Sequence, residues 1–342
     1  MNQTPTRVAF VLDQKIRESF LPQFDRSTFP GIDDVRVDVA GFGPADWERL
    51  LREERPEVVV SGWGTSRIPM EIACLPDLSL RYICHLTGTV RSMVPRELVE
   101  RGVLVTNWGS AISHTIAEHA ILLVLGSLRG MALWKSCMDD TKSGSDVAAR
   151  ILHTRSLKGR KVGIHGFGSI VRNIVLMLQP FGVTISACSA GVPEEIFMQH
   201  GVRPCPTLEE LFATSEVLIE CEALTPQTEG TVTEALIALL PDQTVFVNVG
   251  RGRVVDEAAL AKAAAAGRIR VALDVFQAEP LPRDSPLRLV PDALLSPHCA
   301  GPTHDAYPLC GDFAMENLRR YLAGNRDRMQ GIVTLEIYDR IT

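Results

Sequence analysis

Short apolar runs alternate with helical stretches along most of the chain. In the first hundred or so residues the apolar runs are 8–12, 35–39, 58–60, 80–86 and 103–105. They recur at 183–187, 217–221, 244–249, 269–273 and 293–295, with helical stretches at 208–214, 234–240 and 256–266 among them. Because strands that alternate with helices form parallel sheets, this pattern predicts an α/β protein.

A glycine turn joins a strand to a helix between Lys161 and Arg172, in the sequence KVGIHGFGSIVR. Gly166 would let the chain turn sharply out of the strand, and Gly168 would let a pyrophosphate approach the N-terminus of the helix. Val171 stands where a third glycine or an alanine is usual, so the motif by itself also fits an ordinary strand-to-helix turn. The stretch predicts a dinucleotide site that needs support from elsewhere in the chain.

A long apolar helix is predicted over residues 115–129, with Ser113 as its N-cap. His114, Glu118 and His119 lie at its start, but the two histidines are about 140° apart around a helix. Their order also differs from the spacing of zinc peptidases, so we predict no metal site.

Composition excludes several classes of protein. The 342 residues are 46% hydrophobic and 22% charged, which is globular and long enough for two domains. A net charge of −6 without a basic run argues against nucleic-acid binding, and no apolar run reaches the roughly 18 residues of a membrane span. No signal peptide is recognisable, and the eight cysteines include no C-x-x-C pair, which favours reduced thiols in a cytoplasmic protein.

Polar clusters follow successive strand ends, where open α/β sheets bind their ligands. They are 248–252 with Arg251, Asp274 with Glu279, and His298. Earlier in the chain, the loops 61–66 and 87–91 occupy similar places, although ordinary turn chemistry also explains their small residues. Each cluster taken alone is also explained by a solvated loop.

Together and in this order, the clusters make the chain resemble the D-isomer-specific 2-hydroxyacid dehydrogenase family over nearly its whole length. The matching stretches are 102–107, 117–120, 157–163, 224–228, 248–257, 274–280 and 296–301. The resemblance implies two doubly wound parallel-sheet domains, with a Rossmann-type cofactor domain inserted in a flavodoxin-like substrate domain. Residues 1–113 and 303–342 would form the substrate domain, residues 114–302 would bind the dinucleotide, and the cleft between them would close over both ligands.

The resemblance also implies roles for single residues. Arg251 would grip the carboxylate and carbonyl of a 2-keto acid, because a guanidinium is a planar two-point donor. His298 would give the proton that the new alkoxide needs, and Glu279 would orient its imidazole. The implied cofactor contacts are Gly166, Gly168, Ser169, Ile170, Ser189, Thr225 and Asp274, and the implied substrate contacts are Gly88, Thr89, Arg91 and Arg251.

Three departures from the family pattern affect these expectations. Val171 replaces the third glycine, which would hold the helix slightly away from the strand. No acid follows the second strand near Ser189, so we expect NADH and NADPH to be discriminated by less than about 100-fold, the value of one charged contact. The loop 87–94 lacks two acids that many relatives carry and gains Arg91, which suggests a substrate with a second anionic or strongly polar group.

The sequence therefore predicts an NAD- or NADP-dependent oxidoreductase acting on a small 2-keto or D-2-hydroxy acid. Pairing into a homodimer is expected around residues 115–150, with no nucleic-acid or membrane partner. Two alternatives stay open, namely a non-enzymatic regulator that senses NAD(P) on the same fold and a phosphite- or formate-type dehydrogenase.

Overall fold

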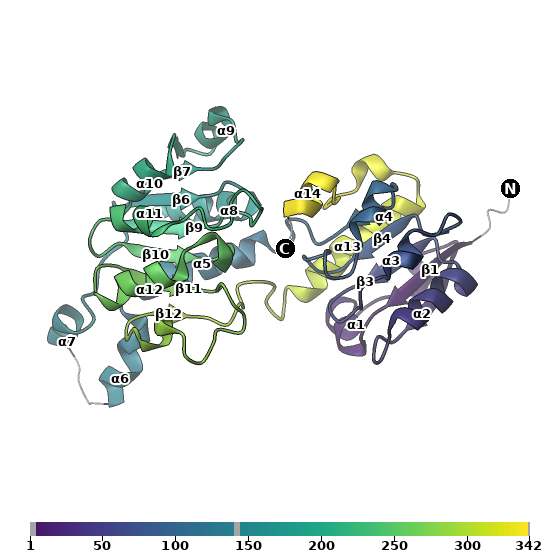
Figure 1. Cartoon of the computed structure of the whole chain (residues 1–342), viewed down its shortest axis with the longest axis horizontal. Helices are drawn as coiled ribbons and strands as arrows, with labels where there is room; N and C mark the ends of the chain where they lie inside the picture. Colours follow the sequence, from purple (N-terminus) through teal and green to yellow (C-terminus); the bar gives the residue numbers. More distant parts are fainter. Residues whose placement is uncertain (1–4, 140–143, 341–342) are drawn as a thin grey trace. The chain divides into compact units, whose positions relative to one another are not determined.

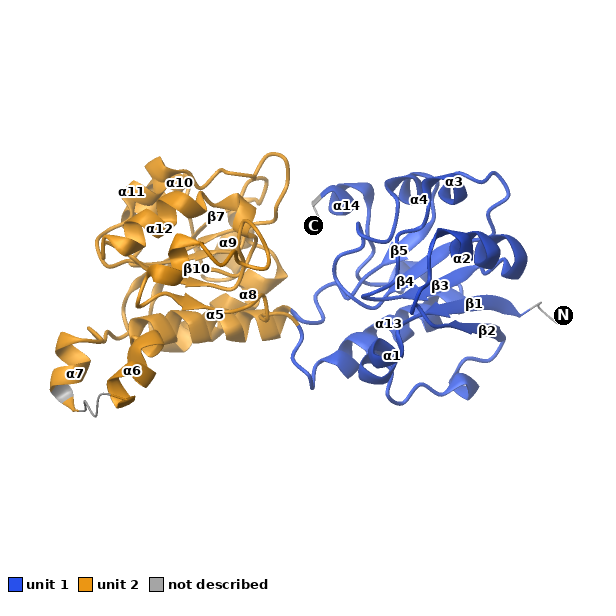
Figure 2. Ribbon diagram, turned by 60° about the horizontal axis from the view of Figure 1, so that its bottom comes forward, with its two compact units in different colours: residues 1–112, 302–342 blue, residues 113–301 orange. Residues whose placement is uncertain are grey.

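The computed structural model describes residues 5–139 and 144–340 (Figure 1). The chain forms two compact units, coloured separately in Figure 2. Unit 1 comprises residues 1–112 and 302–342, and unit 2 is the continuous stretch 113–301. The boundaries expected from the family resemblance differ from these by one residue at each crossing.

Unit 1 is built on a five-stranded sheet in the order β2-β1-β3-β4-β5, with every neighbouring pair parallel. This is the flavodoxin-like order. The strands are β1 Thr6–Val11, β2 Ile32–Val37, β3 Val58–Ser61, β4 Tyr82–His85 and β5 Leu104–Thr106. All residues of β3 and β4 are buried, as expected for central strands of a parallel sheet that is covered on both faces, and only Ser61 and His85 at the strand ends are strongly polar.

Helices from distant parts of the sequence cover the two faces of this sheet (Figure 2). The elements are α1 Gln14–Phe20 and α13 Tyr307–Leu322 on one face, with α2 Pro44–Arg49, α3 Met70–Ala73, α4 Arg96–Glu100 and α14 Leu335–Arg340 elsewhere around the sheet. The ring of Tyr321 in α13 stacks on Tyr82 in β4 at 4.7 Å between centroids. In α14, Tyr338 donates from its hydroxyl to the carbonyl of Val94 at 2.7 Å. The last forty residues thus complete a unit that the first hundred begin.

Unit 2 contains a seven-stranded sheet in the order β12-β11-β10-β9-β6-β7-β8, again parallel throughout. Its strands are β6 Lys161–His165, β7 Thr184–Cys188, β8 Arg203–Pro204, β9 Val217–Glu220, β10 Val245–Asn248, β11 Arg270–Leu273 and β12 Leu294–Leu295. The strand order reverses between β6 and β9, which is the Rossmann arrangement. The predicted fold class of two doubly wound parallel sheets is confirmed.

Two apolar cores flank the sheet of unit 2. One lies under α5 Ser113–Leu128 and α8 Ser169–Leu178, where Val171 is fully buried, and the other under α10 Leu208–Thr214, α11 Glu234–Leu239 and α12 Glu257–Ala265. The remaining helices of the unit are α6 Trp134–Asp139, α7 Ser145–Arg150 and α9 Glu194–Gln199. Short helical turns lie at η1 Arg26–Thr28, η2 Leu50–Glu54, η3 Met131–Leu133, η4 Gln179–Phe181, η5 Gly252–Val254, η6 Pro286–Leu289 and η7 Arg326–Arg328.

The N-terminus of α5 corrects one expectation. Ser113 is the first residue of the helix rather than a cap before it, and its hydroxyl donates to Ser169 Oγ at 2.8 Å. By contrast, Thr207, Thr233 and Asp256 cap α10, α11 and α12 through side-chain oxygens that accept backbone N–H bonds.

Among the described residues, no single helix has the length and apolar composition to cross a membrane. The bent pair Ser113–Leu128 and Met131–Asp139 passes that test only when the two helices are taken together, across a 67° bend.

Candidate active site

Arg251 lies in a loop directly beyond β10, and the residues around it fix the backbone of this loop. Asn248 accepts from the Gly250 N–H at 2.9 Å and donates to the Arg251 carbonyl at 3.2 Å. A Cβ on Gly252 would lie 1.9 Å from the carbonyl carbon of Phe276, so only glycine permits this approach. The loop that carries Arg251 is therefore packed against the loop that leads to Glu279.

Glu279 and His298 form a direct pair. The Glu279 Oε2 atom lies 2.6 Å from His298 Nδ1, and Oε1 accepts from the Phe276 N–H at 3.0 Å. His298 has a left-handed backbone with φ of 52°, held by hydrogen bonds from its N–H to the carbonyls of Asp274 and Ser296. Half of the His298 side chain is exposed.

The guanidinium of Arg251 interacts electrostatically with the Glu279 carboxylate. Burial lowers the pKa of Arg251, and the nearby Glu279 partly offsets this effect. A guanidinium starts from such a high pKa that it stays charged at neutral pH. A fixed cation beside an imidazole–carboxylate pair is suited to an anionic substrate that exchanges a proton.

Asp274 organises the loop that carries the histidine. Its carboxylate accepts from Ser296 Oγ at 2.6 Å and from the N–H groups of Cys299 and Ala300 at 2.9 and 3.0 Å. Burial raises the pKa of Asp274, but His119 and these donors outweigh it and hold the pKa at about 2. Contact of Asp274 with a cofactor stays a prediction, whereas its place in the loop is a feature of the fold.

His119, Asp274 and Cys299 bring one possible metal ligand each to within 4.8 Å of one another. Both Asp274 oxygens already accept hydrogen bonds, and His119 Nε2 lies 2.9 Å from Ser296 Oγ. Hydrogen bonding thus accounts for this cluster without an ion. From the sequence alone, His119 is considered only with His114 and Glu118, and is not related to Asp274 or Cys299.

The glycine turn has the features that a dinucleotide pyrophosphate requires. Gly166 has φ of 101°, and a Cβ there would lie 2.7 Å from the carbonyl oxygen of Cys221. A Cβ on Gly168 would lie more than 4 Å from every residue other than its chain neighbours, and no side chain caps the first turn of α8. Ser169 and Ile170 begin that helix, so their N–H groups belong to an uncapped N-terminus open to an anion. The chain therefore fits a bound dinucleotide.

The other two predicted cofactor residues lie beyond neighbouring strands. Ser189 follows β7 directly, and its hydroxyl donates to Glu222 Oε2 at 2.9 Å. Thr225 begins a tight turn beyond β9, in which Thr225 Oγ1 accepts from the N–H groups of Gln227 and Thr228. At the carboxyl edge of the sheet, Ser189 is thus held by a bond to a residue beyond another strand, and Thr225 by bonds within its own turn.

The predicted substrate residues Gly88, Thr89 and Arg91 lie in a loop of unit 1. A Cβ on Gly88 would lie 2.6 Å from the indole of Trp108, so the loop is tightly packed there, and Thr89 is half-buried. Arg91 is exposed, with its guanidinium carbon 5.9 Å from the centre of the Tyr338 ring. Its role in substrate binding stays a prediction.

Buried hydrogen bonds connect the two small-residue loops of unit 1. The ring of His85 lies 2.9 Å from Ser61 Oγ and 2.7 Å from Thr87 Oγ1. Burial lowers the pKa of His85 to about 4, so the ring is neutral at pH 7. In the loop after β3, Thr65 donates to the Val11 carbonyl at 2.9 Å, which is the turn chemistry expected of small polar residues.

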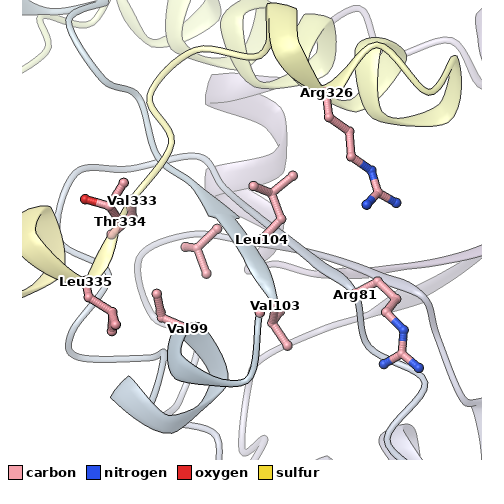
Figure 3. Close-up of a pocket in the computed structure, with 10 residues that line it drawn as sticks. Arg81, Val99, Val103, Leu104, Arg326, Val333, Thr334 and Leu335 are labelled. Carbon is pink, nitrogen blue, oxygen red and sulfur yellow. The ribbon is translucent and has the colours of Figure 1, made fainter.

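A separate cavity of about 350 Å³ belongs to unit 1 (Figure 3). Val99, Val103, Leu104 and Leu335 form much of its apolar lining, while the exposed Arg81 and Arg326 lie on one side. None of the predicted site residues lines this cavity.

Sequence reasoning missed an ionisable cluster beside the glycine turn. His165 Nδ1 lies 2.7 Å from the fully buried Glu220, and His165 Nε2 lies 4.0 Å from Glu222. Burial alone would lower the pKa of His165, but the two carboxylates outweigh it and hold this pKa above its ordinary value. The signal was present, since Glu220 ends an apolar strand and Glu222 lies two residues beyond it, in the same place as the other polar clusters.

These features define a Rossmann-type α/β unit that carries a glycine turn and, beyond other strands, an arginine with a histidine–carboxylate pair. Residues 121–300, more than half of the chain and all within unit 2, match the family described as "D-isomer specific 2-hydroxyacid dehydrogenase, NAD binding domain". The chain belongs to the D-isomer-specific 2-hydroxyacid dehydrogenase family.

Two named relatives match this chain over spans of different length. Over 226 residues the chain is 30% identical to D-3-phosphoglycerate dehydrogenase of Methanocaldococcus jannaschii, covering 66% of this chain and 42% of the relative. Over 246 residues it is 29% identical to glyoxylate reductase of Korarchaeum cryptofilum, covering 72% and 74%. The chain thus spans less than half the length of the phosphoglycerate dehydrogenases that it matches.

Among solved structures, the NADPH-dependent glyoxylate/hydroxypyruvate reductase of Sinorhizobium meliloti, in complex with citrate, superimposes with a TM-score of 0.74. The two sequences are 25% identical, and the match covers 98% of this chain and 100% of the other. The similarity therefore extends over both units.

Proposed function

We propose that this chain is an NAD(P)-dependent oxidoreductase that interconverts a 2-keto acid and a D-2-hydroxy acid. The observation that carries the proposal is the Glu279–His298 pair at 2.6 Å, with the Arg251 loop packed against the chain leading to Glu279. The names of the relatives, which are reductases and dehydrogenases of glyoxylate, hydroxypyruvate and D-3-phosphoglycerate, support it.

In the proposed reaction Arg251 binds the substrate carboxylate and the carbonyl oxygen with parallel N–H donors. A bound nicotinamide dinucleotide supplies the hydride that becomes the new C–H bond at carbon 2. The carbonyl oxygen gains the electron pair of the former π bond and takes a proton from His298 Nε2. Glu279 accepts from Nδ1, which orients the ring and stabilises its charged form. Oxidation of the hydroxy acid runs these steps in reverse.

We propose Gly166, Gly168, Ser169, Ile170, Ser189 and Thr225 as dinucleotide contacts, and Gly88, Thr89 and Arg91 as substrate contacts. The glycine geometry supports the first group, while the second rests on resemblance. Neither the regulator nor the phosphite- or formate-type activity is favoured by the relatives above.

The test is oxidation of NADH and of NADPH by the purified chain with a panel of 2-keto acids. Glyoxylate, hydroxypyruvate, a dicarboxylic and a phosphorylated keto acid would represent the substrate classes. We expect turnover with at least one of them and a D configuration in the product. Binding of a dinucleotide without turnover of any keto acid would instead favour the regulator.

We further propose a homodimer formed around residues 115–150, of which 140–143 lie outside the described residues. Leu122, Trp134 and Met138 support it, because their side chains are 48, 47 and 70% exposed in this segment. Sedimentation of a monomer at micromolar concentration would overturn this part. A cytoplasmic location is proposed from the eight free cysteines.

A further inference from the structure

A carboxylate from another part of the chain lies beside Ser189, although no acid is close to Ser189 in the sequence. Rossmann sites usually hold the adenosine ribose with an acid about twenty residues past the glycines, at the end of the second strand. Here that place is taken by Ser189, whose hydroxyl donates to Glu222 Oε2 at 2.9 Å. Glu222 comes from another strand, since it lies two residues beyond β9.

The strand register explains how Glu222 reaches this place. Cys188, His165 and Glu220 are direct neighbours at the ends of β7, β6 and β9. The Gly166 turn leaves β6 between them, and a Cβ on Gly166 would lie 2.9 Å from the Glu222 N–H nitrogen. The backbone of Glu222 is therefore packed directly against the glycine turn of the dinucleotide site.

The carboxylate of Glu222 is also fixed in orientation. The Ala223 N–H donates to Oε1 at 2.9 Å, and His165 Nε2 lies 4.0 Å from Oε2. With a protonated His165, the cluster of His165, Glu220 and Glu222 carries one net negative charge, and with a neutral His165 it carries two. The Glu222 side chain is 17% exposed, which leaves part of it accessible to a ligand.

We propose that Glu222 accepts hydrogen bonds from the adenosine ribose hydroxyls and makes this chain prefer NAD to NADP. A ribose diol can donate to a carboxylate, whereas a 2′-phosphate would place a second anion against it. This inference rests on the proposed function, because it requires a dinucleotide on unit 2. It keeps the discrimination below about 100-fold, as expected from the residues after β7, and adds its direction, in favour of NAD, and the residue responsible.

The test is the Kd of NADH and of NADPH for the full chain, measured by ligand fluorescence without a keto acid. We expect the unaltered chain to bind NADH on the order of 10- to 100-fold more tightly, the range for one hydrogen bond to a charged group. Glu222→Gln should remove most of this preference, because the hydrogen bond to NADH loses its charge and the repulsion of the NADPH 2′-phosphate is relieved. Glu222→Asp, which keeps the charge, should retain most of it.

Glu234→Gln is the matched control, because Glu234 is an exposed acid of the same unit that pairs with Lys262. It changes the net charge equally and should leave the preference unchanged. Equal affinity for NADH and NADPH in the unaltered chain, or an unchanged preference in a folded Glu222→Gln variant, would overturn the inference alone. Failure of both dinucleotides to bind would overturn the proposed function as well.

Discussion

Replacing Asp274 with Asn tests how the loop that carries His298, the proposed proton donor, is held. The two side chains have nearly the same shape, but asparagine has an NH₂ group in place of one oxygen. In Asp274, Oδ1 accepts from Ser296 and Cys299, and Oδ2 accepts from Ala300. Whichever oxygen is lost, one backbone N–H then faces another donor inside the protein.

Two routes give the size of the effect. A buried donor left without an acceptor costs about 1–3 kcal/mol. The same hydrogen bonds, together with His119, lower the pKa of Asp274 from 3.8 to about 2, and at about 1.4 kcal/mol per unit this favours the ionised form by roughly 2.5 kcal/mol. The side chain is only 1% exposed, so solvent screening is weak. We expect Asp274→Asn to destabilise unit 2 by about 2–3 kcal/mol at pH 7.

The sign of the pH dependence follows from the direction of the shift. Because the folded-state pKa lies below the unfolded value, the stabilisation by Asp274 is fully present above about pH 4. It is lost as the pH falls from about 4 through about 2. The difference between the wild type and Asp274→Asn should therefore be constant from pH 7 to 5 and shrink below pH 4.

Urea unfolding followed by circular dichroism measures this difference, and hydrogen exchange at the Cys299 and Ala300 amides reports the loop itself. Asp284→Asn is the control, because Asp284 is an exposed acid of the same unit. If the unfolding free energies of Asp274→Asn and of this control differed by less than about 0.5 kcal/mol, the usual range for surface substitutions, the hydrogen-bond argument would be wrong.

The remaining predictions concern the proposed reaction. His298→Gln should slow keto-acid reduction by roughly 10²- to 10⁴-fold in kcat while leaving the Kd of NADH nearly unchanged; His153→Gln, at another exposed left-handed histidine, should change neither. Arg251→Lys should raise KM strongly and lower kcat in steady-state assays, because an ammonium cannot reproduce a two-point grip, whereas the exposed Arg253→Lys should have little effect. Arg91→Ala should lower kcat/KM more for a di-anionic keto acid than for a mono-anionic one, with a difference in activation free energy of about 1.5–3 kcal/mol. Equal losses on both substrates would assign Arg91 to its contact with Tyr338 instead.

Much of the fold was predictable because buried parallel strands leave a strong signal. The apolar runs at 217–221 and 269–273 coincide with β9 and β11 to within a residue at each end. The helix α13 went unpredicted although Cys310, Ala314 and Leu318 repeat at helical spacing on its buried face. Its other face is charged, so the stretch does not stand out as an apolar run.

The candidate site was predictable where one strand end supplies one polar cluster, as with Arg251 and Glu279. It was not predictable where two strands share a contact. The pairing of His165 with Glu220 depends on β6 lying beside β9, and Ser189 meets Glu222 only because β7 continues that row. Such contacts follow from strand order and register, which apolar runs do not specify.

Unit 1 is formed by two segments that are far apart in the sequence, and this affects how the nascent chain can fold. Strands β1 to β5 leave the ribosome first, but α13, which packs on β4 through Tyr321, is synthesised only after all of unit 2. Unit 2 is one continuous stretch with its own cores, so it can fold during translation while one face of the earlier sheet stays open to solvent. For the time needed to translate roughly 200 residues, which is about 10–40 s at the usual rate, that apolar face stays accessible to chaperones and prone to aggregation.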